Sequence, residues 1–586
     1  MVSFKKLLLN LTRFSKRERE GKKVEEVVDV VKSSLLISEP VHIVTRDPSL
    51  RVFESYYVYK PFVKVSIAES PEGLMYYVEE YGLTPEDKLI LDKLSEILMD
   101  EIKPPASQSE VKDLRRYVYT EVERIVEKYR TKFGLHSTRR IKLMYYVERN
   151  LIGFGPIDPL MRDPNIEDIS CNGVGVPVYV WHRKYESIPT NIVFVDEDYL
   201  NEFIMKLTHM AGKHISIAFP IVDAMLPGKH RLAATFSREV SVKGPTFTVR
   251  KFREKPFSVT ELITQKTIDP LLAAYLWTMI EHMKTAMIAG GTGTGKTTLL
   301  NVISLFIKPG MKIVTVEETP ELNLPHSNWV QLTTRESYLV GLREAGTDIK
   351  LYDLVRLSLR YRPDYVIVGE VRGEEAYVLF QSLATGHGGL STIHAETLDY
   401  AIKRLTSQPM NIPPAYIKLM NIFIHLNRVV TRIEKGIVKV NRRISVVQEV
   451  VDENNFINIA KWDPRTDSYI IDFSNSYHIK DIAEKRGWDF EDVIEEIYRK
   501  ATVLNWMIYR NILDVWDVSK VVFNYYIDPQ SVYRRAVEEL EKAAVKGVEV
   551  VKEKPSEAVV VEETGETKEL GEATRELFER TRELGK

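Results

Sequence analysis

The hydrophobic pattern predicts alternating strands and helices in the middle of the chain. Between residues 267 and 450, short and almost wholly apolar runs alternate with segments of helical periodicity. Strands that are apolar on both sides suit a sheet whose two faces are covered by helices. The pattern therefore predicts a doubly wound α/β core over 267–450. Its expected strands lie at 286–289, 312–316, 365–369 and 390–394.

Mixed strand and helix patterns precede this core. Alternating runs at 52–59 and 62–67 predict strands, and helical periodicity follows over 85–150. A second group of strand patterns, with one helix at 196–212, ends before Pro256. The expected divisions are an N-terminal α+β and helical region at 1–140, a second, regulatory α+β domain at 141–254 and a linker at 255–266.

The ends of the chain have different patterns. Helical periodicity dominates after about residue 475, so we expect a mostly helical C-terminal extension at 451–545. Charged residues then prevail in a flexible tail at 546–586, with one short helix expected at 572–584. The first 23 residues form a basic amphipathic segment, which suits contact with a membrane surface or a partner, or simply a frayed terminal helix.

Composition narrows the class of protein. The 586 residues carry 81 basic and 83 acidic side chains, a formal net charge of -2, so no overall positive field attracts nucleic acid. The single cysteine, Cys171, excludes an intramolecular disulfide and a cysteine-based zinc module, and we expect it to be a buried apolar residue. No run of 18 apolar residues occurs, and the start lacks the apolar region of a signal peptide. We therefore expect a cytoplasmic protein.

A glycine-rich loop carries the strongest chemical signal. The sequence Gly-Gly-Thr-Gly-Thr-Gly-Lys-Thr at 290–297 follows a predicted strand and opens a predicted helix. In such a loop, backbone N–H groups surround phosphates, Lys296 reaches the β and γ oxygens, and the Thr297 hydroxyl is a ligand for Mg²⁺. The residues expected to bind ATP are Gly290, Gly291, Thr292, Gly293, Thr294, Gly295, Lys296, Thr297 and Thr298.

A carboxylate follows the strand at 365–369. We expect Glu370 to polarise the water that attacks the γ-phosphate and to help hold Mg²⁺. The alternative, an acid in a solvated loop, would be the better interpretation without the glycine-rich loop. Arg372 and Glu374 follow closely and could contact Mg²⁺ indirectly or pair with each other.

Two further strand ends carry candidate residues. Glu317 and Glu318, with Glu321 behind them, could orient water or metal, or could line a solvent-facing loop. His394 ends another predicted core strand, where sheets of this class bind ligands, so we expect it to sense the γ-phosphate. A lone histidine in a strand is otherwise usually structural.

These segments together resemble the secretion-type traffic ATPases, the motors of type II secretion, type IV pili and the archaeal swimming filament. They are similar to that family's Walker A loop (290–297), acidic box (314–321), Walker B segment (362–375) and histidine box (386–395). The resemblance implies a RecA-like ATPase core that uses ATP and Mg²⁺. The chain lacks the four-cysteine zinc insert of the bacterial motors. For this reason, and because of the residue sequence of its acidic box, it looks closest to the archaeal branch.

The resemblance extends to the second α+β domain, which is similar to the family's N-terminal regulatory domain. It makes Arg231, Arg238 and Arg250 candidates to reach phosphate, with Arg231 and Arg250 assigned to catalysis. Surface arginines are more often simply solvated. The long helical C-terminus and the charged tail do not match the family pattern.

The resemblance also implies a function. We expect a homohexameric motor at the cytoplasmic side of a membrane, which pushes a polytopic platform protein to assemble a pilus-like filament or to secrete a pilin-like substrate. An ATP-driven nucleic-acid transfer motor is the main alternative, although only scattered basic residues favour it. A small-molecule kinase is a weaker alternative, since the length, the histidine box and Glu370 all disfavour it.

Overall fold

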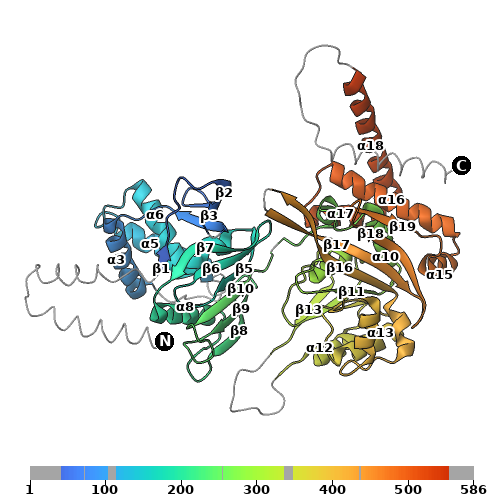
Figure 1. Cartoon of the computed structure of the whole chain (residues 1–586), viewed down its shortest axis with the longest axis horizontal. Coiled ribbons are helices and arrows are strands. Elements are labelled where there is room, and N and C mark those ends of the chain that lie inside the picture. Colours follow the sequence, from blue (N-terminus) through green and yellow to red (C-terminus); the bar gives the residue numbers. More distant parts are fainter. Residues whose placement is uncertain are drawn as a thin grey trace, which may run out of the picture. The chain divides into compact units, whose positions relative to one another are not determined.

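The computed structural model describes residues 41–71, 73–102, 114–253, 255–335, 348–434 and 437–552. The chain forms two compact units, residues 1–252 and residues 253–586 (Figure 1). The basic segment at 1–23 and the tail helix expected at 572–584 lie outside the described residues. The predictions made for them are therefore not tested by the structure.

Unit 1 is built on one ten-stranded sheet. The path runs β2-β3-β4-β7-β6-β5-β10-β9-β8, and β1 pairs with β7. The strands are β1 Val41–Ile43, β2 Val52–Tyr59, β3 Val63–Ser70, β4 Gly73–Glu80, β5 Ile166–Cys171, β6 Pro177–His182, β7 Glu186–Phe194, β8 Ile221–Met225, β9 Arg231–Thr235 and β10 Thr246–Arg250. The main helices are α3 Pro85–Glu101, α5 Leu114–Lys128, α6 Ser137–Val147, α7 Asp158–Arg162 and α8 Glu197–Met210.

The two α+β regions expected at 1–140 and 141–254 share this sheet, because β4 of the first pairs with β7 of the second. A buried carboxylate joins them as well. The hydroxyls of Tyr56 in β2 and Tyr76 in β4 donate to Asp163 Oδ2, at 2.5 and 2.6 Å, and Asp163 is fully buried. A buried carboxylate needs such donors, so the two regions are held together by polar contacts as well as by the sheet.

Unit 2 contains a nine-stranded sheet in the order β13-β12-β14-β15-β11-β16-β17-β18-β19. The strands from β13 to β16 pair in parallel, and the remaining pairings are antiparallel. The strands are β11 Ala286–Gly290, β12 Ile313–Glu317, β13 Trp329–Thr333, β14 Tyr365–Val368, β15 Gly388–Ile393, β16 Ile422–Glu434, β17 Ile437–Val450, β18 Phe456–Asp463 and β19 Ser468–Ile471.

Helices cover both faces of the parallel strands, as the apolar runs predicted. Every residue of β11, β12, β14 and β15 is buried. One face packs against α10 Pro270–Glu281, α11 Lys296–Ser304, α16 Phe490–Tyr509 and α17 Val515–Ile527. The other packs against α12 Leu351–Ser358, α13 Glu375–Ala384 and α14 Leu398–Thr406 (Figure 1). The doubly wound α/β core is confirmed.

The C-terminal helices belong to the same compact unit as this core, whereas the sequence suggested a separate extension after residue 450. The segment after 450 also supplies two strands, β18 and β19, before its helices begin. Those helices are α15 Tyr477–Arg486, α16, α17 and α18 Pro529–Lys552. Part of the expected linker at 255–266 differs too, because it contains the buried helix α9 Val259–Thr264, which packs into the same core.

A buried ion pair joins α16 to α10. The Lys500 side chain is fully buried, and its Nζ donates to Glu281 Oε2 at 2.6 Å and to Thr278 Oγ1 at 3.0 Å. Although burial by itself raises the pKa of the Glu281 carboxyl, Lys500 outweighs it and lowers that pKa to about 2. Each charge therefore has its shortest ionic contact in the other, while Lys308 lies 3.5 Å from Glu281 and Glu496 lies 3.7 Å from Lys500.

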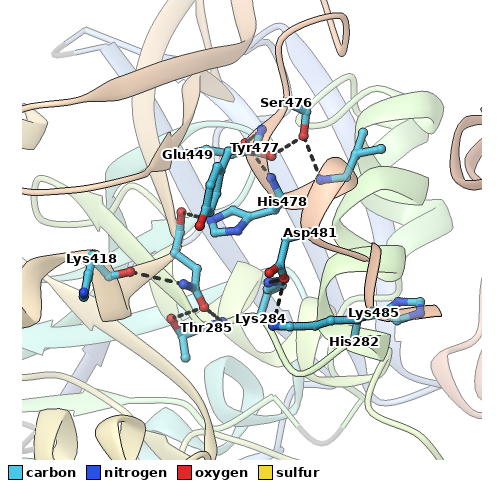
Figure 2. Close-up of polar contacts among 12 residues, drawn as sticks. His282, Lys284, Thr285, Lys418, Glu449, Ser476, Tyr477, His478, Asp481 and Lys485 are labelled. Atoms are coloured by element: carbon cyan, nitrogen blue, oxygen red, sulfur yellow. Dashed lines mark hydrogen bonds and ion pairs between the residues drawn. The ribbon is translucent and has the colours of Figure 1, made fainter. Parts of the chain in front are cut away.

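A buried carboxylate in β17 also anchors α15 (Figure 2). Glu449 Oε1 accepts from the hydroxyls of Tyr275 (2.7 Å) and Ser476 (2.6 Å). Its Oε2 accepts from the backbone N–H groups of Tyr477 (2.7 Å) and His478 (3.1 Å), at the start of α15. These amides have no partner within the helix, so Glu449 satisfies them and fixes the helix on the sheet.

Two expectations from composition can be compared with the structure. Cys171 is fully buried in β5, and burial raises the pKa of its thiol to about 11, so the thiol is unreactive at neutral pH. Among the helices of the described residues, none combines the length and the apolar character needed to cross a membrane.

We predict that Lys500→Ala lowers the free energy of unfolding by about 3–5 kcal/mol, because it removes the buried partner of Glu281 and leaves that carboxylate with the longer contact to Lys308, at 3.5 Å. Urea unfolding followed by tryptophan fluorescence measures the change. The control is Lys520→Ala, which removes an exposed pair with Asp517 and should cost less than about 1 kcal/mol. Equal effects of the two substitutions would contradict a role for Lys500 in holding α16 to the core.

Candidate nucleotide-binding site

Parallel strands bring the candidate residues to one edge of the unit 2 sheet. β11, β15, β14 and β12 are neighbours and run in the same direction. The loop at 290–297 follows β11, Glu317 ends β12, Glu370 follows β14 and His394 follows β15. Because parallel strands have their carboxyl ends at the same edge, segments up to a hundred residues apart in the chain meet there.

The glycine-rich loop adopts a conformation that only glycine permits at two positions. A Cβ on Gly290 would lie 2.6 Å from the carbonyl oxygen of Leu426 and 2.7 Å from Thr294 Oγ1. Gly295, which precedes the first residue of α11, has a φ of +93°. Residues that carry a side chain rarely adopt such a φ. The glycines at these positions therefore allow the tight turn of the loop and leave its backbone open to a ligand.

Lys296 is held inside the loop. Its Nζ donates to the carbonyl oxygens of Gly290 (3.1 Å) and Gly291 (2.8 Å) and lies 3.5 Å from His394 Nδ1. Burial lowers the pKa of the Lys296 ammonium, and the Glu370 carboxylate opposes that shift. The ammonium therefore lies inside the loop, where its acceptors are neutral backbone carbonyls.

A chain of polar contacts links the other candidates. Glu370 Oε1 lies 3.1 Å from His394 Nε2, and Glu370 Oε2 accepts from Arg372 Nη2 at 2.7 Å. Arg372 Nη1 in turn lies 3.7 Å from Glu318 Oε2. Burial, and next the Lys296 ammonium, lower the pKa of the His394 imidazole, so His394 is neutral at neutral pH. The structure thus joins Lys296, His394 and Glu370 in one cluster.

Backbone contacts position Glu370 and His394. The N–H of Gly369 donates to the carbonyl of Val316, and Thr392 Oγ1 donates to the carbonyl of Gly369 at 2.8 Å. Arg404 in α14 donates to the carbonyl of His394. These bonds tie the ends of β12, β14 and β15 together, so Glu370 and His394 are presented from a rigid edge.

Glu317 has a different environment from Glu370. Only 2% of it is exposed, and its Oε1 accepts from the backbone N–H groups of Glu321 and Leu322, both at 2.8 Å. Gln331 Nε2 donates to its other oxygen at 2.9 Å. Burial raises the pKa of the Glu317 carboxyl to about 7. Its contacts shape the loop of the acidic box, while the catalytic roles expected for Glu317 and Glu318 stay predictions.

The candidate arginines lie in unit 1, and each pairs with an acid there. Arg231 Nη2 lies 2.5 Å from Asp223 Oδ2, and Arg250 Nε lies 3.3 Å from Asp168 Oδ1. Both arginines line a cavity of about 370 Å³ on the sheet of unit 1. Arg238 pairs instead with Glu197 at 2.7 Å. The role in hydrolysis expected for Arg231 and Arg250 stays a prediction.

Several residues at this edge escaped sequence reasoning. Glu375 Oε1 accepts from the backbone N–H groups of Arg372 (2.6 Å) and Gly373 (2.7 Å), which shapes the turn after Glu370. Arg428 in β16 and Arg442 in β17 lie against the glycine-rich loop. The apolar run of β16 could have been recognised as a strand. Nothing in the sequence, however, indicates that Arg442 in the hairpin reaches Gly293, 149 residues earlier.

The residues at this edge fit a nucleoside triphosphate with Mg²⁺. The loop has no side chain at the points where Gly290 and Gly295 approach other groups, and α11 begins with backbone N–H groups suited to phosphate oxygens. Among the described residues, no three His, Cys, Asp or Glu side chains are arranged to hold a metal. Mg²⁺ bound with a nucleotide needs few protein ligands, and Thr297 and Glu370 are the residues that would hold it.

A parallel sheet with a glycine-rich loop between β11 and α11, and acids at the neighbouring strand ends, defines the P-loop class of proteins. Within that class, the chain belongs to the type II/IV secretion system protein family, whose model matches residues 151–455. The family predicted from the motifs is therefore confirmed. So is the expected fold class, a RecA-like doubly wound core preceded by α+β domains and followed by helices.

Relatives occur in archaea and bacteria. An uncharacterized protein of Methanocaldococcus jannaschii, MJ0900, is 39% identical over 404 residues, which is 67% of this chain and 71% of the relative. A Mycobacterium tuberculosis protein, Rv3659c, provisionally named a conjugal transfer protein, is 32% identical over 269 residues (44% and 74%). The type IV secretion system protein PtlH of Bordetella pertussis is 30% identical over 285 residues (44% and 80%).

We predict that Gly290→Ala destabilises the protein even without a ligand, by about 1–3 kcal/mol, because the added Cβ would overlap the Leu426 carbonyl. Thermal unfolding in nucleotide-free buffer measures the effect. Gly291→Ala is the matched control, since a Cβ there would meet only Thr294 Cγ2 at 3.9 Å, and it should change stability by less than about 0.5 kcal/mol. Unaltered unfolding of Gly290→Ala would show that the loop tolerates a wider conformation.

Proposed function

We propose that this protein is an ATP hydrolase that works as a homohexameric motor, powering assembly of a type IV pilus-like filament or secretion of a pilin-like substrate. The observation that carries the proposal is the cluster of Lys296, His394 and Glu370 beside the glycine-rich loop. It combines a phosphate-binding ammonium with a carboxylate able to act on water, as phosphoryl transfer to water requires. Family membership supports the same conclusion.

Each residue of the cluster has a distinct task in this reaction. Lys296 exchanges its bonds to loop carbonyls for bonds to the β and γ oxygens of ATP. Glu370 accepts a proton from the attacking water, whose oxygen forms a bond to the γ-phosphorus while the bond to the ADP oxygen breaks. His394 lies between Lys296 and Glu370. It contacts the γ-phosphate and, through its contact with Glu370, links binding of that phosphate to the position of the carboxylate. Mg²⁺ bound with the nucleotide supplies positive charge that offsets the charge of the phosphates.

The motor is proposed to act on a polytopic platform protein from the cytoplasmic side of a membrane. The relation to PtlH, named as a type IV secretion system protein, supports a role at a secretion apparatus. The basic segment at 1–23 is the part of the sequence best suited to an anionic membrane surface. Arg231 and Arg250 are proposed to assist hydrolysis, as the family resemblance implied.

A second candidate is an ATP-driven motor for nucleic-acid transfer. The mycobacterial relative, provisionally named for conjugal transfer, favours it. The near-zero net charge gives it no electrostatic support, because non-specific nucleic-acid binding depends on basic surfaces. ATP turnover that rises several-fold on addition of single- or double-stranded DNA, and falls again with salt, would favour this candidate over the filament motor.

We predict that Glu370→Gln and Lys296→Ala have different kinetic effects. Glu370→Gln should bind ATP about as tightly as the unaltered protein yet hydrolyse it 10²- to 10⁴-fold more slowly, on the order expected for a lost general base. Lys296→Ala should weaken both nucleotide binding and turnover, because the ammonium contacts phosphate before and during the reaction. Phosphate release and titration with a fluorescent ATP analogue measure the two quantities.

Glu453→Gln, in the exposed turn between β17 and β18, is the matched control and should leave both quantities unaltered. If Glu370→Gln kept more than about a third of normal turnover, another residue would be the base, and Glu317 and Glu318 would be tested next. Loss of ATP binding in Glu370→Gln would make Glu370 a structural or metal-binding acid instead.

We also predict that a non-hydrolysable ATP analogue with Mg²⁺ promotes a closed ring. Ring closure follows when each copy presents different surfaces to its two neighbours, and a homohexamer is the proposed end point. Light scattering coupled to size-exclusion chromatography, with and without the analogue, gives the mass. A monomer under both conditions at micromolar concentration would argue against the hexameric motor while leaving the hydrolysis proposal intact.

A further inference from the structure

The hairpin of β16 and β17 passes beside the glycine-rich loop. Gly290, the last residue of β11, pairs with Leu426 of β16, and Leu426 pairs with Ile444 of β17. The hairpin continues beyond this point, so its next residues lie past the carboxyl end of β11. There Arg428 and Arg442 are directly opposite each other in the antiparallel register. Both arginines therefore lie level with the loop that follows β11.

The Arg442 side chain contacts the loop, and the Arg428 side chain lies beside it. Arg442 Nε donates to the carbonyl of Gly293 at 3.2 Å, and its Cδ lies 3.1 Å from where a Cβ on Gly295 would be. Arg428 Nη1 lies 3.9 Å from the corresponding position on Gly293. The absence of side chains at Gly293 and Gly295 thus makes room for two guanidinium groups along the loop.

The charge arrangement suits an anion. The register places two cationic side chains at directly opposite positions, and their charges make this part of the hairpin favourable to an anion. The neighbouring Arg443 shows the structural alternative, since it is buried and donates to both carboxylate oxygens of Asp467, at 2.7 and 2.9 Å. Arg442 instead contacts a loop whose backbone is built to receive phosphate.

The sheet order indicates which part of a nucleotide these arginines would contact. The groups proposed for hydrolysis, Glu370 and His394, follow β14 and β15, on one side of β11. Arg428 and Arg442 come from β16 and β17, on the other side. A nucleotide whose γ-phosphate is directed toward Glu370 and His394 therefore has its remaining phosphates nearer to the hairpin.

We propose that Arg442, with Arg428, is a second cationic contact for the phosphates that ATP and ADP share, placed across the loop from the hydrolytic cluster. This assignment rests on the proposed function, because it takes a nucleotide as the ligand of the loop. A guanidinium presents several N–H donors in one plane and matches phosphate oxygens well. Such a residue strengthens the binding of ATP and ADP alike and contributes little to the chemical step.

The test substitutes Arg442→Gln, which keeps an amide able to reach the Gly293 carbonyl but removes the charge. The Kd for both ATP and ADP should rise roughly 10- to 100-fold, the loss typical of a charge-assisted hydrogen bond. The turnover number at saturating ATP should change by less than about threefold, so that KM alone rises. Arg428→Gln should act in the same direction, which keeps the test available if one variant fails to fold.

The matched control is Arg465→Gln in the exposed turn between β18 and β19, which removes the same charge from the antiparallel part of the sheet. It should leave both Kd values within about twofold, which separates a local contact from a general effect of charge. Inorganic tripolyphosphate serves as a competitor. Its binding should weaken in Arg442→Gln as much as that of ADP if the arginine contacts phosphate.

Three results would overturn the proposal. The first is a Kd for ATP and ADP that is unaltered in both arginine variants. The second is a loss of turnover in these variants with unaltered nucleotide binding. The third is an Arg442→Gln variant that binds ADP more weakly but binds tripolyphosphate normally, since Arg442 would then contact the base or the ribose. Nucleotide binding by Lys296→Ala, measured in the same experiment, distinguishes failure of the arginine assignment from failure of the proposed function. If it alone loses nucleotide binding, the hydrolase proposal stands and only the arginine assignment fails.

Discussion

The parallel pairing of β11 with β15, and of β15 with β14, is the constraint on which the site depends. It brings the loop after β11, Glu370 after β14 and His394 after β15 to one edge. Parallel strands need buried faces, so this pairing in turn requires helices on both sides of the sheet. The apolar strands, the two layers of helices and the polar edge are therefore consequences of one arrangement.

Most polar groups of that edge bind one another, although the buried Glu370 Oε1 accepts no hydrogen bond from the described residues and only faces His394 Nε2. Lys296 donates to carbonyls of its own loop, and Glu370 is bound to Arg372. A phosphate that binds Lys296 has to replace bonds that already exist, so the net gain is smaller than the gross strength of the new contacts. The same bonds hold the side chains near the geometry in which they would be used, which lowers the cost of organising them on binding.

The C-terminal helices show how an apparent appendage becomes part of a core. Lys500 is buried against Glu281, and Glu449 accepts four hydrogen bonds around the start of α15. Buried charges of this kind are costly unless every partner is in place, so they specify one position for each helix more strongly than apolar contacts do. The helices beyond residue 475 thereby support the sheet from the face that α10 and α11 also cover.

The sequence by itself determined the features that depend on neighbours in the chain. The loop at 290–297, the apolar strands and the acids at their ends are local patterns, and together they indicated the fold class and the family. Tertiary structure decided everything that depends on partners distant in the chain. Only the fold shows that Glu317 is buried against its own loop, that the two N-terminal regions share a sheet, and that Arg442 reaches Gly293. The physical reason is that periodicity records which face of an element is buried, whereas strand order and register decide which residues meet across it.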